Sequence, residues 1–273
     1  MSVIGVCKLC QRASVELRDS HLLPKAGYRL ITKSQGGEAP ILINPEIAIS
    51  KDEQVRAYVF CNDCEDLFNK NGESWVLKNC YRDGKGFALK DALDAALPEY
   101  DDGKLKVYAT ASIPNIDVSK LVYFAASIFW RSSVYNWKSG KRALVLPTLG
   151  PKYKEQFRQY LLGVEGFPER ATLWLSVITE SQLWNYFTFP YGSKKEDYWQ
   201  YHFQFLGFVF TLHLGNLVPR EYRQFCLAHS PQHFIAMSKA ADNMVLVHGG
   251  KVQVKSRPVG SLAEWLKKPE SLL

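Results

Sequence analysis

Two Cys-x-x-Cys pairs, formed by Cys7 with Cys10 and by Cys61 with Cys64, constrain the fold of this chain more than any other feature. Six cysteines among 273 residues give about 0.1 such pairs by chance, so two pairs are a rare event. Four thiolates on two tight turns are the soft, tetrahedral ligand set that Zn²⁺ prefers. The alternatives are free core thiols or a redox dithiol, but a redox motif needs only one pair beside a βαβ unit. We therefore predict one structural zinc ion in a treble-clef module.

The composition is that of a folded protein with a sizeable core, because 47% of the residues are hydrophobic and 13% are aromatic. The first residues lack the basic and apolar segments of a secretory signal, and the apolar runs at 121–130 and 205–212 are too short to cross a bilayer. Six cysteines are too few for a disulfide scaffold, so Cys80 and Cys226 are interpreted as buried thiols. We expect a cytoplasmic protein without membrane contact.

The positive charge of the chain lies downstream of the cysteine pairs. The formal charge is +7, and residues 1–75 hold nine Lys+Arg against ten Asp+Glu, which leaves 25 basic against 17 acidic residues in the remainder. An excess of this size favours a polyanionic partner such as a nucleic acid, although many solvated surfaces share it. Nearer to the cysteines, three cations are candidates for phosphate contacts: Arg18, Lys25 and Arg29.

The distribution of apolar residues predicts an α+β fold in two parts. Residues 1–80 are expected to form the zinc-binding module, and residues 81–273 a larger α+β domain. Within the module, a helix is expected to run from the second cysteine turn to the helix breaker Asn71-Gly72. The elements of the module are predicted at 16–23 (strand), 41–49 paired with 55–60 (hairpin) and 63–70 (helix), with a polar loop around 34–37.

The larger part is expected to be built around one buried helix at about 119–137, where apolar residues are almost continuous. Within this helix, Arg131 is expected to bind a carboxylate in the core. A C-terminal sheet is predicted to follow, in which one unbroken strand would place His202 and His213 on opposite faces. The remaining elements are predicted at 85–97 and 153–162 (helices), at 107–109, 173–178, 184–189 and 199–214 (strands), and at 244–255 (hairpin).

Between the cysteine pairs, His21 follows Cys10 by eleven residues and precedes Pro24 by three. A strand histidine of this kind, then a hairpin, then a cysteine pair that opens a helix, resembles the HNH or ββα-metal endonuclease family over about 70 residues. The resemblance implies hydrolysis of a phosphodiester bond with one catalytic cation. It also implies that His21 is the general base that deprotonates water.

The same resemblance assigns a catalytic Mg²⁺ or Mn²⁺ to oxygen ligands on the short helix. Glu65 directly follows the second cysteine pair, and Asn69 lies four residues further on the same helix face. Asn44 is a candidate for the middle residue of the motif, whereas Ser20 replaces the ligand that usually precedes the histidine. The alternatives are a solvated helix face for Glu65 and Asn69, and for His21 a hydrogen bond within its own hairpin or a spare zinc-ligand role.

Three functions are compatible with these patterns. The first is a metal-dependent HNH-type nuclease that hydrolyses DNA or RNA, with His21 as general base. The second is a non-catalytic treble-clef zinc protein that binds a nucleic acid, a protein partner or a small ligand. The third is a small-molecule or nucleotide sensor whose pocket is formed by the aromatic segments 184–189 and 199–210. A cation beside His21 would favour the first, and a closed histidine would argue against it.

Overall fold

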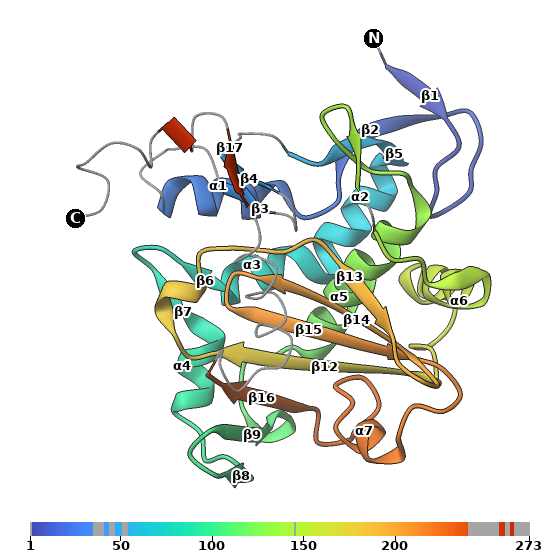
Figure 1. Ribbon diagram of the computed structural model, residues 1–273. Helices are drawn as coiled ribbons and strands as arrows, with labels where there is room; N and C mark the ends of the chain where they lie inside the picture. The colour runs from blue at the N-terminus through green and yellow to red at the C-terminus, as the bar shows by residue number, and fades with distance from the viewer. Residues whose placement is uncertain are drawn as a thin grey trace.

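A computed structural model describes residues 2–34, 41–43, 47–50, 54–144, 146–239, 257–259 and 263–264. Within these residues the chain has a mixed α+β architecture with one seven-stranded sheet and several smaller sheets (Figure 1). The α+β class expected from the sequence is confirmed. The hairpin predicted at 244–255 and the candidate residue Asn44 lie outside the described residues.

The N-terminal part contains a three-stranded antiparallel sheet in the order β1 (Val3–Gly5), β2 (Val15–His21) and β5 (Arg56–Cys61). The strand predicted at 16–23 is therefore confirmed as β2. The predicted pairing of 41–49 with 55–60 is wrong, because β5 pairs with β2, whereas β3 (Ile41–Ile43) pairs with β4 (Ile47–Ser50). A second partner of β4 is β17 (Arg257–Val259), which runs parallel to it.

A helix that the sequence reading missed, α1 (Lys25–Ser34), follows β2. Its signals are Pro24 just before the first turn and the apolar pair Tyr28 and Ile31, which are three residues apart and both buried. The polar loop predicted around 34–37 begins at the last residue of this helix, and no element is predicted for the residues between it and the strand at 16–23.

The second cysteine turn opens a helix that continues past its predicted end. It consists of α2 (Asn62–Phe68), the π-helical turn η1 (Asn69–Glu73) and α3 (Ser74–Asn79). Gly72 lies inside this helix and does not end it. It allows a close packing contact, because a Cβ atom at this position would lie 2.9 Å from the Cα and the backbone nitrogen of Phe124. The glycine thus allows η1 to lie directly against the next long helix.

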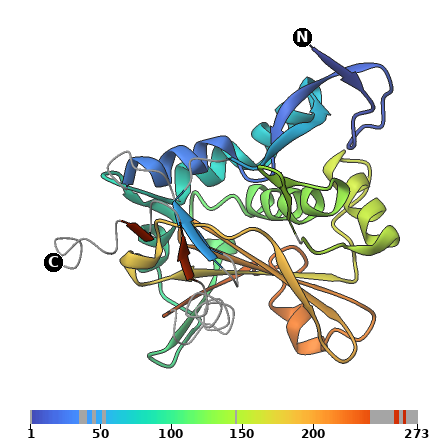
Figure 2. The same ribbon diagram turned by 45° about the horizontal axis from the view of Figure 1, so that its top comes forward.

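That helix, α5 (Val118–Val134), is the central helix predicted from the sequence. Asp117 caps its N-terminus by accepting a 3.1 Å hydrogen bond from the Lys120 amide. Every residue from 121 to 133 is buried. The helix ends three residues earlier than predicted, since Tyr135 has extended dihedral angles of −145° and 149°. Figure 2 shows α5 between the N-terminal elements and the large sheet.

The large sheet has the strand order β13-β14-β15-β12-β16-β9-β8. All neighbouring strands are antiparallel except β12 and β16. The packing of α5 on the sheet centres on Phe124, whose ring centroid lies 5.2 Å from that of Phe205 and 5.7 Å from that of Phe210. The strands are β8 (Tyr100–Asp101), β9 (Leu105–Ala109), β12 (Ala171–Ile178), β13 (Tyr191–Lys194), β14 (Trp199–Phe205), β15 (Phe208–Leu214) and β16 (Phe234–Ser238).

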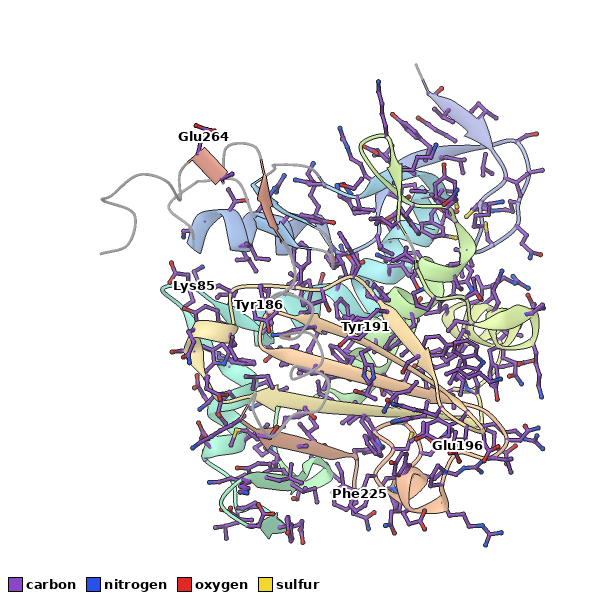
Figure 3. The ribbon with its side chains drawn as sticks, viewed as in Figure 1. Lys85, Tyr186, Tyr191, Glu196, Phe225 and Glu264 are labelled. Carbon is purple, nitrogen blue, oxygen red and sulfur yellow. The ribbon has the colours of Figure 1, made fainter. Side chains whose placement is uncertain are left out.

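The predicted strand at 199–214 is a hairpin of two strands. Leu206 and Gly207 form its two-residue turn with φ angles of 47° and 90°, and β14 pairs with β15 on either side. The pairing of Gln200 with His213 and of His202 with Thr211 places both histidines on one face, so the expectation of opposite faces is wrong. Figure 3 shows Tyr191 and Glu196 near the two ends of the neighbouring edge strand β13.

The other predictions for the large part are mostly confirmed. The strands expected at 107–109 and 173–178 lie within β9 and β12, and the helices expected at 85–97 and 153–162 correspond to shorter or shifted elements. The segment 184–189 is not a strand, because Phe187 makes one isolated bridge to Phe205 and the 3₁₀ turn η3 (Ser181–Leu183) precedes it. The remaining elements are β6 (Tyr81–Arg82), β7 (Gly86–Phe87), α4 (Ala88–Asp94), η2 (Thr110–Ser112), β10 (Lys138–Ser139), β11 (Arg142–Ala143), α6 (Gly150–Leu161) and α7 (Arg220–Gln224).

One hydrophobic core runs through the described residues. It begins at Cys7 in the first cysteine turn and reaches Met237 in β16, with the residues of α5 between them. The boundary at residue 80 stays a prediction. Among the described residues, no helix combines the length and the apolarity that spanning a membrane requires.

Candidate metal centre and its surroundings

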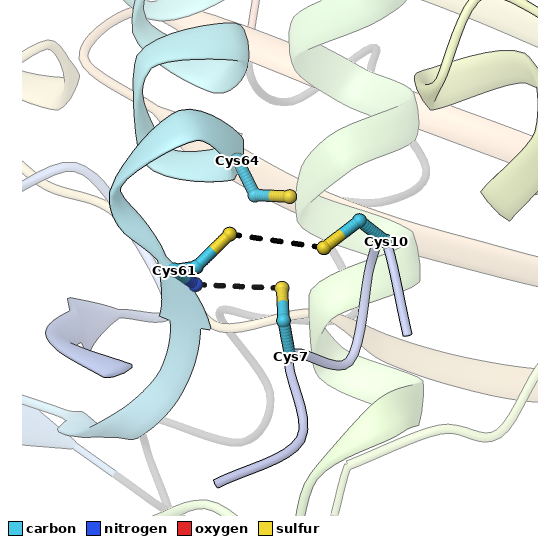
Figure 4. A group of neighbouring side chains, drawn as sticks. All are labelled: Cys7, Cys10, Cys61 and Cys64. Carbon is cyan, nitrogen blue, oxygen red and sulfur yellow. Dashed lines mark hydrogen bonds between the residues drawn. The ribbon is translucent and has the colours of Figure 1, made fainter. Parts of the chain in front are cut away.

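The structure brings the two cysteine pairs together, as the sequence predicts. The loop after β1 carries Cys7 and Cys10, β5 ends at Cys61, and the first turn of α2 carries Cys64 (Figure 4). All four sulfur atoms lie within 4.8 Å of one another, and the sulfur atoms of Cys10 and Cys61 are 3.7 Å apart. Zinc–sulfur bonds of about 2.3 Å in a tetrahedron place sulfur atoms roughly 3.8 Å apart. The cluster therefore has the size and the chemistry for a zinc ion.

Backbone and side-chain donors surround these sulfur atoms. The Cys61 amide donates to the sulfur of Cys7 at 3.4 Å, and the Arg12 guanidinium donates to the sulfur atoms of Cys10 and Cys61 at 3.5 Å. Arg12 also forms an ion pair with Asp63. Such donors stabilise negative charge on thiolates and orient them, so they support a metal held by four sulfur ligands.

Contact between the thiols of Cys7 and Cys64 shifts their pKa values in opposite directions. A hydrogen bond from Cys64 lowers the pKa of Cys7 to about 4, and the same contact raises the pKa of Cys64. Three of the sulfur ligands are buried and the fourth, Cys10, is half-buried. A bound zinc ion would keep all four cysteines as thiolates in this enclosed site, because its positive charge offsets the burial of negative charge.

His21 lies at the last position of β2, where its strand ends beside β5. Its Nε2 donates a 2.8 Å hydrogen bond to the Gln54 side-chain oxygen, and its ring is half-buried near Tyr28. Burial lowers the pKa of His21, and the hydrogen bond to Gln54 opposes that effect. The imidazole is therefore neutral at pH 7, and its nearest polar partner is an amide rather than a carboxylate.

Glu65 lies on the inner side of α2 and faces a buried charge network. Its Oε1 is buried without a hydrogen-bond partner among the described residues. Burial raises the pKa of Glu65, whereas the positive charge of Arg131 and a contact with Ser20 lower it. Among the described residues, the α5 arginine is the main charge that favours the ionised form of this carboxyl.

Arg131 is the centre of this network. Its side chain is 2% exposed and pairs with Glu73 of η1 at 2.6 Å, which confirms the expectation that it binds a carboxylate in the core. A second nitrogen donates at 3.3 Å to the backbone carbonyl of His21, and the guanidinium lies 3.9 Å from the centre of the Phe68 ring. The arginine thus links α5 to β2 and to the helix that carries the cysteine ligand.

The side chain of Asn69 forms a hydrogen bond within its own helix. It is exposed, and its side-chain oxygen accepts a 2.6 Å hydrogen bond from the Ser74 hydroxyl, which bridges the π-helical turn. The helix is regular between the two residues, because the Asn69 amide donates to the Glu65 carbonyl, so Asn69 follows Glu65 by four residues on the same helix face, as predicted. Arg131 contacts the His21 carbonyl and acts on the Glu65 carboxyl, whereas the side chain of Asn69 bonds Ser74.

Two participants of this region escaped the sequence reading. Gln54 precedes β5 and carries no motif, and Glu73 lay beyond the predicted end of the helix at Asn71-Gly72. One sequence feature points to Glu73, because Arg131 is expected to bind a carboxylate.

Two surface cavities, of about 870 Å³ and 420 Å³, are lined by residues outside 184–189 and 199–210.

Comparison of the chain with protein-family models, with curated proteins and with solved structures finds no match.

Proposed function

We infer that this chain is a treble-clef zinc protein in which the metal stabilises the fold and the protein surface binds a nucleic acid without cleaving it. The cysteine turn before β2, the pairing of β2 with β5 and the helix α2 that begins at the second cysteine pair support the treble-clef assignment. The excess of basic residues supports a polyanionic partner.

The observation that carries the non-catalytic assignment is the position of Arg131. The resemblance to HNH nucleases would require a divalent cation near Ser20 and Glu65. In this chain a buried guanidinium supplies the positive charge near Glu65 and already pairs with Glu73. A divalent cation beside Arg131 would be repelled by it, and Ser20 offers a hydroxyl in place of a stronger ligand. The hydroxyl of Ser20 also accepts a hydrogen bond from the Phe60 amide at 3.2 Å.

One observation favours the nuclease as a second candidate. His21 is half-exposed and neutral at pH 7, as a general base must be, and it lies at the strand position that the resemblance assigns to this role. In this alternative, substrate phosphate and its accompanying Mg²⁺ or Mn²⁺ would approach from the solvent side of His21.

A cleavage assay separates the two candidates. Wild-type protein with one bound zinc ion per chain is incubated with plasmid DNA and with RNA, in the presence of Mg²⁺ or Mn²⁺. We expect no cleavage, and we expect the His21→Ala variant to behave identically. Cleavage by the wild type that is lost in His21→Ala, with zinc content and thermal stability unchanged, would establish the nuclease. The His229→Ala variant reports whether removal of an exposed histidine elsewhere in the chain has the same effect.

A further inference from the structure

A cavity of about 420 Å³ opens between the start of β5 and the hairpin formed by β10 and β11. The green hairpin lies beside β2 and β5 in Figure 1. Two cations line the cavity, Arg56 and Lys138, together with the amides of Gln54 and Asn136 and the ring of Tyr135. The cavity thus combines positive charge, neutral hydrogen-bonding groups and an aromatic face.

The aromatic wall is held in place by the core. Tyr135 is 40% exposed, but its ring packs edge-on against Trp137 with centroids 5.4 Å apart. Trp137 is fully buried, and its indole nitrogen donates a 2.8 Å hydrogen bond to the carbonyl of Arg131 at the end of α5. Tyr135 therefore presents a surface that loses little conformational freedom when a planar group stacks on it.

The β10–β11 hairpin fixes the backbone positions of two lysines, Lys138 and Lys141. Lys138 pairs with Ala143 and Ser139 with Arg142, which leaves Gly140 and Lys141 as a two-residue turn. Gly140 has a φ of 57°, a conformation that such turns require and that glycine adopts without strain. The exposed side chains of Lys138 and Lys141 are thus carried by a short, closed hairpin.

The charges around the cavity are mainly positive. The Arg56 side chain is 59% exposed and pairs with Asp19 at 2.5 Å. The positive charges of Lys25 and Arg56 both act on the neighbouring His21. Tyr58 follows on the same face of β5 as Arg56 and is 47% exposed, so a second aromatic ring extends the surface. Cations interleaved with exposed aromatic rings are typical of surfaces that bind single-stranded nucleic acids.

We propose that this cavity, with Arg56 and Lys138 as phosphate contacts and Tyr135 as a base-stacking platform, is the binding site for a single-stranded nucleic acid. The proposal rests on the nucleic-acid binding put forward above and names its site and its substrate class. A single strand is favoured over a duplex because an unpaired base can reach the Tyr135 ring, whereas bases in a duplex are stacked on one another. The amides of Gln54 and Asn136 can then bond base edges without a strong sequence requirement.

The test is fluorescence anisotropy of zinc-loaded protein with labelled single strands of about fifteen thymidines or uridines, and with a duplex of equal length. The Arg56→Gln/Lys138→Gln double variant is expected to bind the single strands about tenfold more weakly than the wild type. Its slope of log affinity against log salt should be smaller by about 1.4, the value for two lost phosphate contacts on a single strand. Tyr135→Ala should weaken binding at least about fivefold, and Tyr135→Phe should restore it.

The matched control is Lys85→Gln/Lys104→Gln, which removes the same charge from two exposed lysines in the β6–β7 and β8–β9 turns. This variant should bind like the wild type. If wild type binds single strands but the cavity variants bind equally well, the proposed site is overturned and the nucleic-acid function stands. A stronger affinity for the duplex than for the single strand would also overturn the proposal. If zinc-loaded wild type binds neither, both this site and the nucleic-acid function fail, and a protein partner becomes the better assignment.

Discussion

At the scale of single residues, the described part of the chain contains a buried histidine outside the metal centre. His213 is fully buried in β15, where its ring lies among those of Trp174, Tyr198 and Tyr222 at centroid distances between 4.6 and 5.7 Å. The amide nitrogen of Gln200 lies 2.9 Å from its Nε2. Burial lowers the pKa of His213 to about 4.

This burial predicts a dependence of stability on pH. The unfolded chain binds a proton at His213 near pH 6.5, whereas the folded protein does so only near pH 4, so stability is present above pH 6.5 and is lost as the pH falls between these values. The loss from this residue amounts to at most about 3 kcal/mol. The free energy of unfolding, measured with urea at several pH values, should fall less steeply in His213→Gln. An identical slope in both proteins would contradict the prediction. The exposed Lys104→Gln variant serves as a control.

The sequence predicts residue roles where a strong pattern exists. The four cysteines were found because their spacing is rare, and Arg131 was assigned a carboxylate because an arginine within an apolar helix needs one. Gln54 could not be predicted, since its contact with His21 depends on a strand pairing between segments far apart in the chain. His21, Glu65 and Asn69 as catalytic residues stay a prediction.

At the scale of elements, the structure differs from the sequence-based expectation mainly at two glycines. The sequence Asn71-Gly72 predicts the end of a helix. The sequence alone does not distinguish a glycine that ends a helix from a glycine that lets another helix approach. Gly207 was placed within one long strand, although it forms the turn of the β14–β15 hairpin with a φ of 90°. The contact that explains Gly72 is with Phe124, a residue distant in sequence that no local pattern contains.

The close approach at η1 makes a specific prediction. In Gly72→Ala, the new Cβ would overlap the backbone of Phe124, so η1 and α5 must separate. We expect the free energy of unfolding to fall by about 1–3 kcal/mol, measured by chemical denaturation. The matched substitution Gly166→Ala has open space around its Cβ and should change stability by less than about 0.5 kcal/mol. A Gly72→Ala variant as stable as Gly166→Ala would show that the two helices do not pack this closely.

At the scale of the whole molecule, the candidate zinc site and the large sheet share one core. Cys7, Cys61 and Cys64 belong to the same hydrophobic cluster as α5 and the strands of the sheet. Loss of the metal would leave four thiols close together in this core. The loop that carries Cys7 and Cys10 would then no longer be held by metal–sulfur bonds.

We therefore expect that zinc removal destabilises the entire molecule rather than the N-terminal part alone. A strong chelator, or the Cys61→Ser variant, should lower the unfolding temperature by about 10 °C or more. Near-ultraviolet circular dichroism of the tryptophans, including the buried Trp130 and Trp137, should change in the same transition. Cys226→Ser makes the same substitution at a buried thiol outside the cluster and should have a much smaller effect. Loss of zinc without a change in unfolding temperature would show that the metal contributes little to the fold.

The N-terminal elements, α5 and most strands of the large sheet follow one another along the chain, so they are also synthesised in that order. All four cysteines lie within the first 64 residues, so they leave the ribosome well before α5 and long before β16, which completes the pairing with β9 and β12. The metal site can assemble on the nascent chain while the sheet is still incomplete. The apolar surface that α5 later covers would be exposed during that interval, which is when the growing chain is most prone to aggregate.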